Sequence, residues 1–350
     1  MSGQSAEEKV VDLAALRACM EHTLVADGMS AAHAAETAEV LLDAELRGYD
    51  DHGVFFLGEI HKWFVAGALN PAPNITVVRE TDAALVLDGD SGCGVAASFQ
   101  AMRWCMEKAA ARGMAAAAIQ RSGHFVAAAP FVAMAAKAGF IAICAANVVP
   151  LIVAPGGKSR ALGTNPLAFA APTTGPHPVV FDTASSAIAG FKVRVMAQKG
   201  ETLEPGLIVD KAGDPSTDPA DLDRGGSLLP FGGHRGYGIA MMVEVLAGVL
   251  TGAGFGATAG VTHGKEGHFF LVIDPGLFIP REEVPARMDE LVRHIKSGQT
   301  IDGVSEILVP GERGQRRAAE LTASGKVPLN AVGWRTLQTV CSETGVALPA

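Results

Sequence analysis

The sequence lacks any dense run of lysine and arginine, and 37 acidic residues outnumber 28 basic ones, which gives a formal net charge of -9. Proteins that bind a phosphate backbone usually carry a basic patch, so we expect no nucleic-acid partner. The rest of the composition is ordinary for a globular protein, with 49% hydrophobic and 19% charged residues. A chain of 350 residues is long enough for a substantial core and about two or three structural units.

The sequence also lacks an apolar stretch long enough to cross a membrane. Its most apolar run, residues 139–155, is interrupted by Asn147 and Pro150, whereas a membrane-spanning helix needs roughly 18 or more apolar residues. The first residues, MSGQSAEEKVVDLAAL, are acidic and have no basic flank followed by an apolar segment, so they do not resemble a signal peptide. We therefore expect no membrane partner and a cytoplasmic location.

Cysteine is scarce, and no CxxC pair indicates a disulfide framework or a zinc site. An odd number of scattered cysteines favours buried free thiols. His52 and His61 lie nine residues apart, a spacing that matches neither one helix face nor HExxH, so we expect no metal site. The five cysteines are Cys19, Cys93, Cys105, Cys144 and Cys341.

Apolar periodicity predicts a helical unit over the first seventy residues. Apolar residues recur at helical intervals from Leu13, with Asp12 as the N-cap and Gly28 as the stop. The segment 30–48 repeats this plan, and a third helix is predicted from Val54 to Ala66.

After Pro73 the pattern changes to alternating strands and helices, which predicts an α/β region. The segment 205–230 is rich in Asp, Gly and Pro and is predicted to be a loop or lid. Strands are predicted at 75–79, 83–88, 114–120, 140–146, 167–171, 178–182 and 268–274, and helices at 95–112, 187–199, 236–251, 282–298 and 331–343.

Two short segments suggest chemistry from their residues alone. His52 follows Asp51 at the predicted start of a helix, where the carboxylate favours a protonated imidazole and makes His52 a candidate proton donor. The alternative is a capping aspartate beside a surface histidine. Asp182 ends an apolar run at a predicted turn, where its oxygens can bind ribose hydroxyls or simply stabilise the turn.

The segment 88–98, DGDSGCGVAAS, looks like a glycine-rich phosphate loop. Its glycines follow the order GxxGxG instead of GxGxxG, so we interpret it as a tight turn.

Several motifs stand in an order that resembles the malate/L-lactate dehydrogenase family. They are DHGV at 51–54, GHF at 123–125, GGKSRALGTNPLAFAAP at 156–172, FDTASSAIAG at 181–190, LLPFGGHRGYGIAMMVEVLAGVLTG at 228–252 and PGER at 310–313. The resemblance implies an α/β fold with a non-classical, non-Rossmann mixed sheet, an N-terminal helical unit and C-terminal helices that pack near it. It also implies NAD or NADP as cofactor, a homodimer, and a small 2-oxo or 2-hydroxy acid as substrate.

Three domains are expected on this basis: an N-terminal helical unit (1–72), an α/β cofactor- and substrate-binding domain (73–280) and a C-terminal helical segment (281–350). The PFGGHRG and PGER segments are also similar to family members that reduce cyclic 2-imino acids such as piperideine-2-carboxylate, which is the alternative substrate class. A nicotinamide-binding protein without catalytic activity is the alternative from another functional class.

The resemblance assigns roles to individual residues. It implies that His52 donates the proton with Asp51 beside it, and that His124 either shares this role or lies beside the cofactor. Thr164 is expected near the substrate. The positions expected to contact the cofactor are His124, Phe125, Asp182, Thr183, Ala184, His234, Arg235, Gly311, Glu312 and Arg313. A helix that begins near His234 would present its N-terminus to a diphosphate.

Some positions depart from the family pattern. Asp51 stands where serine is usual, and Phe56 stands where an arginine commonly binds the substrate carboxylate. Either another cation such as Arg47 or Arg121 enters the pocket, or the substrate presents an apolar or uncharged group there. Arg235 replaces a usual lysine, and Val126 replaces a usual small residue.

The choice between NADH and NADPH stays open. Four cations are candidates for contact with a 2′-phosphate, but no spacing decides among them. They are Lys158, Arg160, Lys192 and Arg194.

Overall fold

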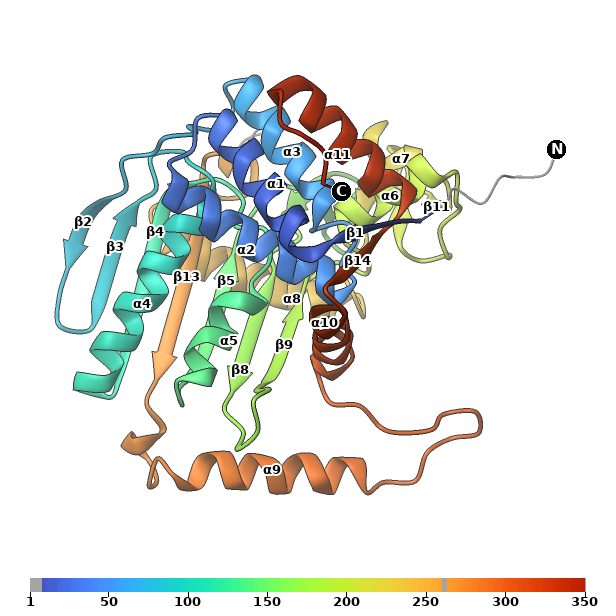
Figure 1. Cartoon of the computed structure of the whole chain (residues 1–350). Coiled ribbons are helices and arrows are strands. Elements are labelled where there is room, and N and C mark those ends of the chain that lie inside the picture. The colour runs from blue at the N-terminus through green and yellow to red at the C-terminus, as the bar shows by residue number, and fades with distance from the viewer. Residues whose placement is uncertain (1–7, 260–262, 350) are drawn as a thin grey trace.

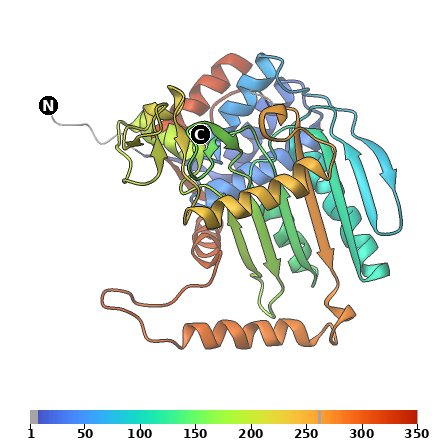
Figure 2. The same ribbon diagram turned by 180° about the vertical axis from the view of Figure 1, so that it is seen from behind.

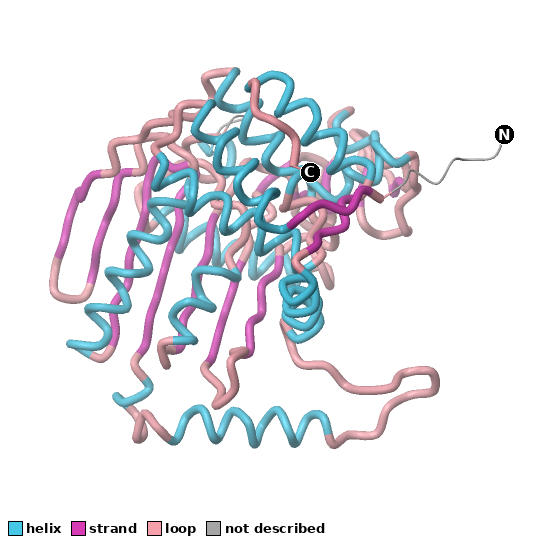
Figure 3. The backbone as a smooth tube through the Cα atoms, viewed as in Figure 1, coloured by secondary structure: helices cyan, strands magenta, loops and turns pink. Residues whose placement is uncertain are grey.

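The computed structural model describes residues 8–259 and 263–349, and its centre is a mixed sheet of seven strands (Figures 1 and 3). In spatial order the strands are β2 (Thr76–Glu80), β3 (Ala84–Asp88), β4 (Met114–Ser122), β13 (Glu266–Ile273), β5 (Ile141–Ala146), β8 (Leu167–Ala171) and β9 (Val179–Thr183). Strands β3 and β4 run parallel, and every other neighbouring pair in this sheet is antiparallel. A Rossmann sheet is mostly parallel, so the predicted non-Rossmann mixed sheet is confirmed.

Helices cover the two faces of this sheet unequally. Helices α4 (Gly94–Arg112) and α5 (Ala129–Lys137) pack on one face, and small buried residues of β4 such as Ala115 and Ala117 allow close approach (Figure 1). On the other face, α8 (His234–Val243) continues into the π-helical segment η1 (Glu244–Val249) and crosses the strands (Figure 2). The predicted helix 236–251 is therefore present, with a change of helical type inside it.

The N-terminal helices form as predicted. They are α1 (Leu13–Ala26), α2 (Ala31–Arg47) and α3 (Val54–Val65). Asp12 caps α1 by accepting from the amide of Ala15 at 2.9 Å, and Ser30 caps α2 through the amide of His33 at 3.2 Å. Gly48, with φ of +88°, ends α2 in the left-handed conformation that glycine adopts most easily.

The two ends of the chain pack together. Strand β1 (Lys9–Asp12) pairs antiparallel with β14 (Lys326–Leu329), and α10 (Glu312–Ser324) packs on α2 while α11 (Ala331–Thr344) packs on α3. The expectation that C-terminal helices lie near the N-terminal unit is confirmed. Helix α10 and strands β1 and β14 were not among the predicted elements.

The prediction of a loop or lid at 205–230 is wrong. This segment contributes β10 (Ile208–Val209), β11 (Pro215–Ser216) and β12 (Ser227–Leu228) to a second sheet with β6 (Ile152–Val153) and β7 (Arg160–Leu162). The short helix α7 (Ala220–Asp223) lies between β11 and β12 in the chain. Two-residue strands have no period to detect. Their buried residues instead join helix α6 (Gly190–Lys199) in a separate small core around Ile152, Leu222 and Leu228.

Helix α9 (Glu283–Lys296) lies along one end of the strands, apart from the body of the chain (Figure 1). None of its residues is buried, although Leu291 and Ile295 on it are apolar. Among the described residues, no helix is both long and apolar enough to span a bilayer. The domain limits at residues 72 and 280 stay a prediction. The remaining short helical turns are η2 (Gly256–Ala259) and η3 (Pro275–Leu277).

Candidate active site

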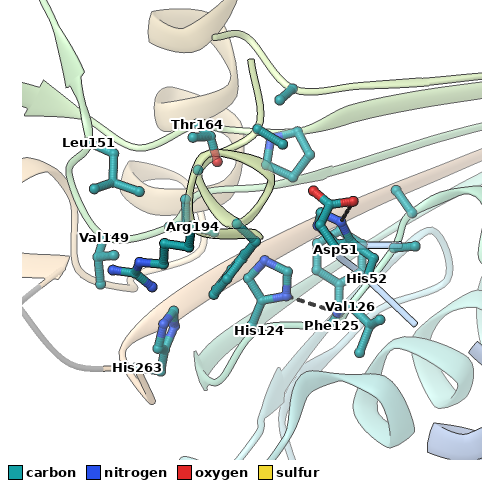
Figure 4. Close-up of a pocket in the computed structure, with 18 of the residues that line it drawn as sticks. Asp51, His52, His124, Phe125, Val126, Val149, Leu151, Thr164, Arg194 and His263 are labelled. Atoms are coloured by element: carbon teal, nitrogen blue, oxygen red, sulfur yellow. Dashed lines mark hydrogen bonds and ion pairs between the residues drawn. The ribbon is translucent and has the colours of Figure 1, made fainter. Parts of the chain in front are cut away.

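A cavity of about 650 Å³ lies between the N-terminal helical unit, one end of the central sheet and the small second sheet. This volume is in the range of small-molecule binding sites. Its lining residues come from segments far apart in the sequence: Tyr49, Asp51, His52, Trp63, Ala68, His124–Ala128, Val148–Leu151, Arg160, Thr164, Pro166, Asp182–Ala184, Ala189–Phe191, Arg194, Ala257 and His263. Figure 4 shows that the two histidines predicted to be functional, His52 and His124, face the same space.

A buried carboxylate holds the turn that carries His52. Glu45 of α2 accepts a hydrogen bond from the amide of Val54 at 2.8 Å and so caps the start of α3. Burial raises the pKa of Glu45 to about 7. A Cβ at position 53 would lie 2.1 Å from Oε2 of Glu45, so Gly53 is required by this close approach.

His52 is paired with Asp51 inside the cavity. Nδ1 of His52 lies 3.0 Å from Oδ1 of Asp51, and both side chains are largely buried. Burial alone lowers the pKa of His52, but the charge and hydrogen bond of Asp51 outweigh it, so the pKa lies above its ordinary value. Burial likewise opposes ionisation of Asp51, and the charge of His52 reverses this and lowers the pKa of Asp51. The pair therefore favours an imidazolium next to a carboxylate.

His124 has the opposite electrostatics. Burial, followed by the nearby His263 and His52, holds the pKa of His124 well below its ordinary value. The amide of Val126 donates to Nδ1 of His124 at 3.0 Å, so the neutral ring carries its proton on Nε2. Val126 has a φ of +71°, a strained conformation for a β-branched residue, and this turn places its amide under the histidine. His124 is thus a neutral hydrogen-bond donor.

Asp182 lies at the end of β9 and lines the cavity together with Thr183 and Ala184. Its Oδ2 accepts the amides of Ala128 and Ala129 at 3.1 and 2.8 Å, which fixes the start of α5. Burial raises the pKa of Asp182, and these two amides oppose the rise. Asp182 therefore stabilises the turn before α5 and faces the cavity, and its contact with ribose hydroxyls stays a prediction.

Two residues expected at the substrate do not line the cavity. Phe56 is fully buried behind His52, with the rings stacked at 5.6 Å and 8°, and it also contacts His124. Arg47 pairs with Asp43 of its own helix at 2.6 Å, because residues four apart lie on one helix face.

The other cation considered for this role, Arg121, pairs with Asp88 and Asp90 at 3.1 and 3.3 Å and is more than half exposed outside the cavity. The expectation that Arg47 or Arg121 enters the pocket is therefore corrected. Both cations have a local carboxylate that holds them elsewhere.

Two groups of residues expected at the cofactor also lie outside the cavity lining. His234 and Arg235 are exposed at the start of α8. Gly311 packs on the backbone of β9, where a Cβ would lie 2.5 Å from the carbonyl oxygen of Val180, and Glu312 pairs with Lys296 at 2.6 Å. Arg313 is exposed on α10. Their contact with a cofactor stays a prediction.

The glycine-rich segment 88–98 is a packed turn, as interpreted from its glycine order. A Cβ at Gly92 would lie 2.5 Å from the side chain of Pro73, and one at Gly94 would lie 2.3 Å from the carbonyl oxygen of Gly123. Both glycines are needed for packing, and neither lines the cavity.

Several lining residues were not predicted as part of the substrate site. Trp63, Phe191 and His263 form aromatic walls, with the rings of Trp63 and His263 4.0 Å apart. Arg160 and Arg194 bring positive charge into the cavity. The helical spacing of Trp63 indicated only a core position, and Phe191 and Arg194 belong to a helix with no distinctive pattern. Within the residues that the structure describes, no group of three or more His, Cys, Asp or Glu is placed to hold a metal ion.

Fold and site together define a nicotinamide-dependent oxidoreductase that does not use a Rossmann sheet. The family model for malate/L-lactate dehydrogenase matches residues 11–338. The malate dehydrogenase of Pyrococcus abyssi is 36% identical over 287 residues, 79% of each chain. The Delta(1)-pyrroline-2-carboxylate/Delta(1)-piperideine-2-carboxylate reductase of Pseudomonas syringae pv. tomato is 34% identical over 88% of this chain and 90% of its own.

Solved structures agree with these sequence matches. The crystal structure of malate dehydrogenase from Entamoeba histolytica superposes with a TM-score of 0.92 at 26% identity, covering 98% of this chain and 100% of that one. The chain belongs to the malate/L-lactate dehydrogenase family.

Proposed function

We propose that this protein interconverts small 2-oxo acids and 2-hydroxy acids with NAD(H) or NADP(H), and that His52 carries the proton. The observation that supports this most is the His52–Asp51 pair inside the cavity, 3.0 Å apart and shielded from solvent. A proton carrier works best when its pKa is close to the working pH. Burial lowers the pKa of His52, and Asp51 raises it again, so that the ring can hold a proton inside the cavity. The cofactor, when bound, supplies or accepts the hydride at C2 of the substrate.

In this proposal the two histidines divide the work. His52 uses Nδ1 for Asp51, so its Nε2 gives a proton to the substrate oxygen during reduction and takes it back during oxidation. His124, neutral and protonated on Nε2, donates a hydrogen bond without losing its proton. The ring centroids lie 6.2 Å apart, which places both histidines around one small group. Thr164 lies on the same cavity and adds a hydroxyl.

The cavity also fits a nicotinamide cofactor. Phe125 to Ala128 and Val148 to Leu151 give it apolar walls for a planar ring, and Asp182, Thr183 and Ala184 supply polar side-chain and backbone groups beside them. These residues, with His124, are the ones we expect to hold the cofactor.

Two alternatives compete with this proposal. A reductase of cyclic imines occurs both among the sequence relatives and among the structural matches. Several relatives are named malate, lactate or sulfolactate dehydrogenase, and this favours the 2-oxo acid. A catalytically silent nicotinamide-binding protein would not need an intact histidine–aspartate pair in a shielded cavity.

The test is the initial rate of NADH and NADPH oxidation with straight-chain 2-oxo acids, bulky 2-oxo acids and cyclic 2-imino acids. His52→Gln should lower kcat by roughly 10²- to 10⁴-fold, and His124→Gln should lower it less. His22→Gln, exposed on α1, is the control and should leave the rate unchanged. Turnover that survives in His52→Gln would reject His52 as the proton carrier. Absence of turnover with either cofactor in the folded wild type would favour the silent binding protein.

We also propose a homodimer in the cytoplasm, with no nucleic-acid or membrane partner. Exposed apolar side chains occur on strands β8 and β9 and along α8 and η1, and the amphipathic α9 has no buried residue of its own. A second copy of the chain would cover these surfaces. They include Phe169, Phe181, Met241, Met242, Val245, Val249 and Leu250. The net charge of -9 and the free thiols are consistent with the cytoplasmic location.

Sedimentation velocity of the wild type should give twice the mass of one chain. Val249→Glu should shift the protein toward monomers, because it buries a charge in the contact, whereas Glu320→Gln on the outer side of α10 should not. A monomeric wild type would reject the dimer.

A further inference from the structure

Two arginines, Arg160 and Arg194, line the cavity, and they are the only lysine or arginine side chains among its described lining residues. Burial, and next the charge of Arg194, lowers the pKa of Arg160, so the two guanidinium groups are close enough to repel each other. The carboxylate paired with Arg194, Asp223, is 64% exposed and 3.3 Å away, so solvent screens it. This end of the cavity therefore favours an anionic ligand.

The two arginines differ in how much of each guanidinium is already engaged. Arg160 donates from Nε to the carbonyl oxygen of Gly226 at 2.9 Å and from Nη2 to that of Leu222, so it ties β7 to the turn before β12. Among the described residues, the hydrogen bond of Arg194 uses Nε only, toward Asp223. Both terminal amino groups of Arg194 are left for a ligand.

Arg194 is held at a fixed place relative to the histidines. Its guanidinium lies 5.4 Å from the ring centre of Phe191, whose own ring is 6.1 Å from that of His52 and 6.0 Å from that of His124. Figure 4 shows Arg194 pointing into the cavity on the side of Val149 and His263.

Helix α6, which carries Arg194, is clamped to the turn before His52. Lys192 and Lys199 pair with Asp50 at 2.6 and 3.2 Å, two residues before His52. These ion pairs hold Arg194 and His52 at a fixed separation, as substrate positioning requires.

We propose that Arg194 binds the carboxylate of the 2-oxo acid and sets the orientation of C2 toward His52. This inference rests on the proposed function. Position 56 offers no charge, since Phe56 is buried behind His52, so the anchor must come from another element. A guanidinium with two free amino groups matches a carboxylate in a bidentate geometry. The cation–π contact with the ring of Phe191 holds this guanidinium in place.

The test compares Arg194→Gln and Arg194→Lys with the wild type. The control is Arg224→Gln, because Arg224 is exposed and does not line the cavity. Arg194→Gln should raise KM for the 2-oxo acid by roughly 10- to 100-fold, while the dissociation constants of NADH and NADPH stay within about two-fold. Arg194→Lys should recover part of the loss, because it keeps the charge and loses the bidentate fork. An unchanged KM for the 2-oxo acid would overturn the proposal. A loss confined to NADPH would also overturn it, because it would assign Arg194 to the 2′-phosphate.

A binding measurement separates this inference from the proposed function. Oxamate, a carboxylate that is not reduced, is titrated into the protein with NADH while the tryptophan fluorescence, to which Trp63 in the cavity wall contributes, is followed. Weaker oxamate binding in Arg194→Gln supports the anchor even if the wild type reduces no 2-oxo acid, in which case only the proposed function fails. Equal oxamate binding in wild type and Arg194→Gln rejects the anchor, whatever the turnover.

Discussion

The side-chain amide of Asn165 donates to the carboxylate of Glu244 at 2.5 Å, and this bond joins the GTNP segment to the π-helical segment η1 behind the cavity. The other carboxylate oxygen of Glu244 accepts the amide of Gly256 at 2.7 Å and the side-chain amide of Asn147 at 3.3 Å. Asn165, Asn147 and Glu244 are all buried. A fully hydrogen-bonded buried network of this kind fixes the loops that it joins.

Glu244→Gln should destabilise the protein, because one acceptor oxygen becomes an amino group that faces the donor of Asn165. The expected loss in the free energy of unfolding is about 1–3 kcal/mol, measured by urea denaturation. Glu320→Gln, exposed on α10, is the control and should change stability by less than about 0.5 kcal/mol. Equal stability of Glu244→Gln and the wild type would mean that the network rearranges at no cost.

Most of the fold was predictable from the sequence where the periodicity is long. The caps at Asp12 and Ser30 and the strands of the central sheet came from local signals that act over a few residues. The small second sheet was missed because its strands are as short as two residues and are defined by pairing with distant segments, such as Leu228 with Ile152.

For the candidate site, the sequence predicted His52 and His124 but neither His263 nor the arginine in the cavity wall. A carboxylate next to His52 in the sequence is also next to it in space, since the distance is set by one turn. Arg194 enters the cavity only because α6 docks on the turn before His52 through Asp50, a long-range contact without a sequence signal. Arg47 failed as a candidate because Asp43, four residues earlier, binds it.

Asp51→Asn should move the pH dependence of reduction to lower pH. Reduction needs protonated His52, whose pKa is raised, so the rate falls as the pH rises through this raised pKa. Without the carboxylate the pKa of His52 drops, and the fall begins at lower pH. At a pH between the pKa of His52 in the variant and its pKa in the wild type, the variant should be slower by roughly 10-fold. At lower pH the difference between the two rates should shrink.

Oxidation needs neutral His52, so the rate of oxidation rises as the pH rises through the pKa of His52. In Asp51→Asn this rise should begin at lower pH than in the wild type. The measurement is kcat/KM across pH 5 to 10 in both directions, with Asp43→Asn, whose carboxylate pairs with Arg47, as the control. Superimposable profiles for Asp51→Asn and the wild type would show that Asp51 does not tune His52.

His61 should make stability depend on pH. Its Nδ1 lies 2.8 Å from Asp27 and its Nε2 lies 2.8 Å from Glu343, so it joins the end of α1 to α11. Burial lowers the pKa of His61, but the two carboxylates outweigh burial and raise it above its ordinary value. Burial raises the pKa of Asp27, and His61 only partly offsets this rise.

Because the folded-state pKa of His61 is raised, its contribution to stability is complete below the unfolded-state pKa, about 6.5, and is lost as the pH rises through the folded-state value. His61→Gln should therefore cost about 1–3 kcal/mol near pH 6 and less above pH 8. The measurement is chemical denaturation at both values of pH, with His22→Gln, exposed on α1, as the control. A cost that does not depend on pH would indicate a packing role alone.

The five thiols should be unreactive in the folded protein. All five are buried, and burial raises the pKa of Cys19 to about 12 and that of Cys93 to about 11, so almost no thiolate is present near neutral pH. The sulfurs of Cys19 and Cys341 are 3.3 Å apart, which is a contact between thiols and longer than a disulfide bond of about 2.05 Å.

A colorimetric thiol reagent should therefore titrate none of the thiols in the native state and all five in guanidinium. Three thiols after denaturation would show instead that Cys19 and Cys341, which join α1 to α11, had been oxidised to a disulfide. One thiol that reacts within minutes in the native state would show that the structure around it opens locally, because burial is what keeps these cysteines protonated.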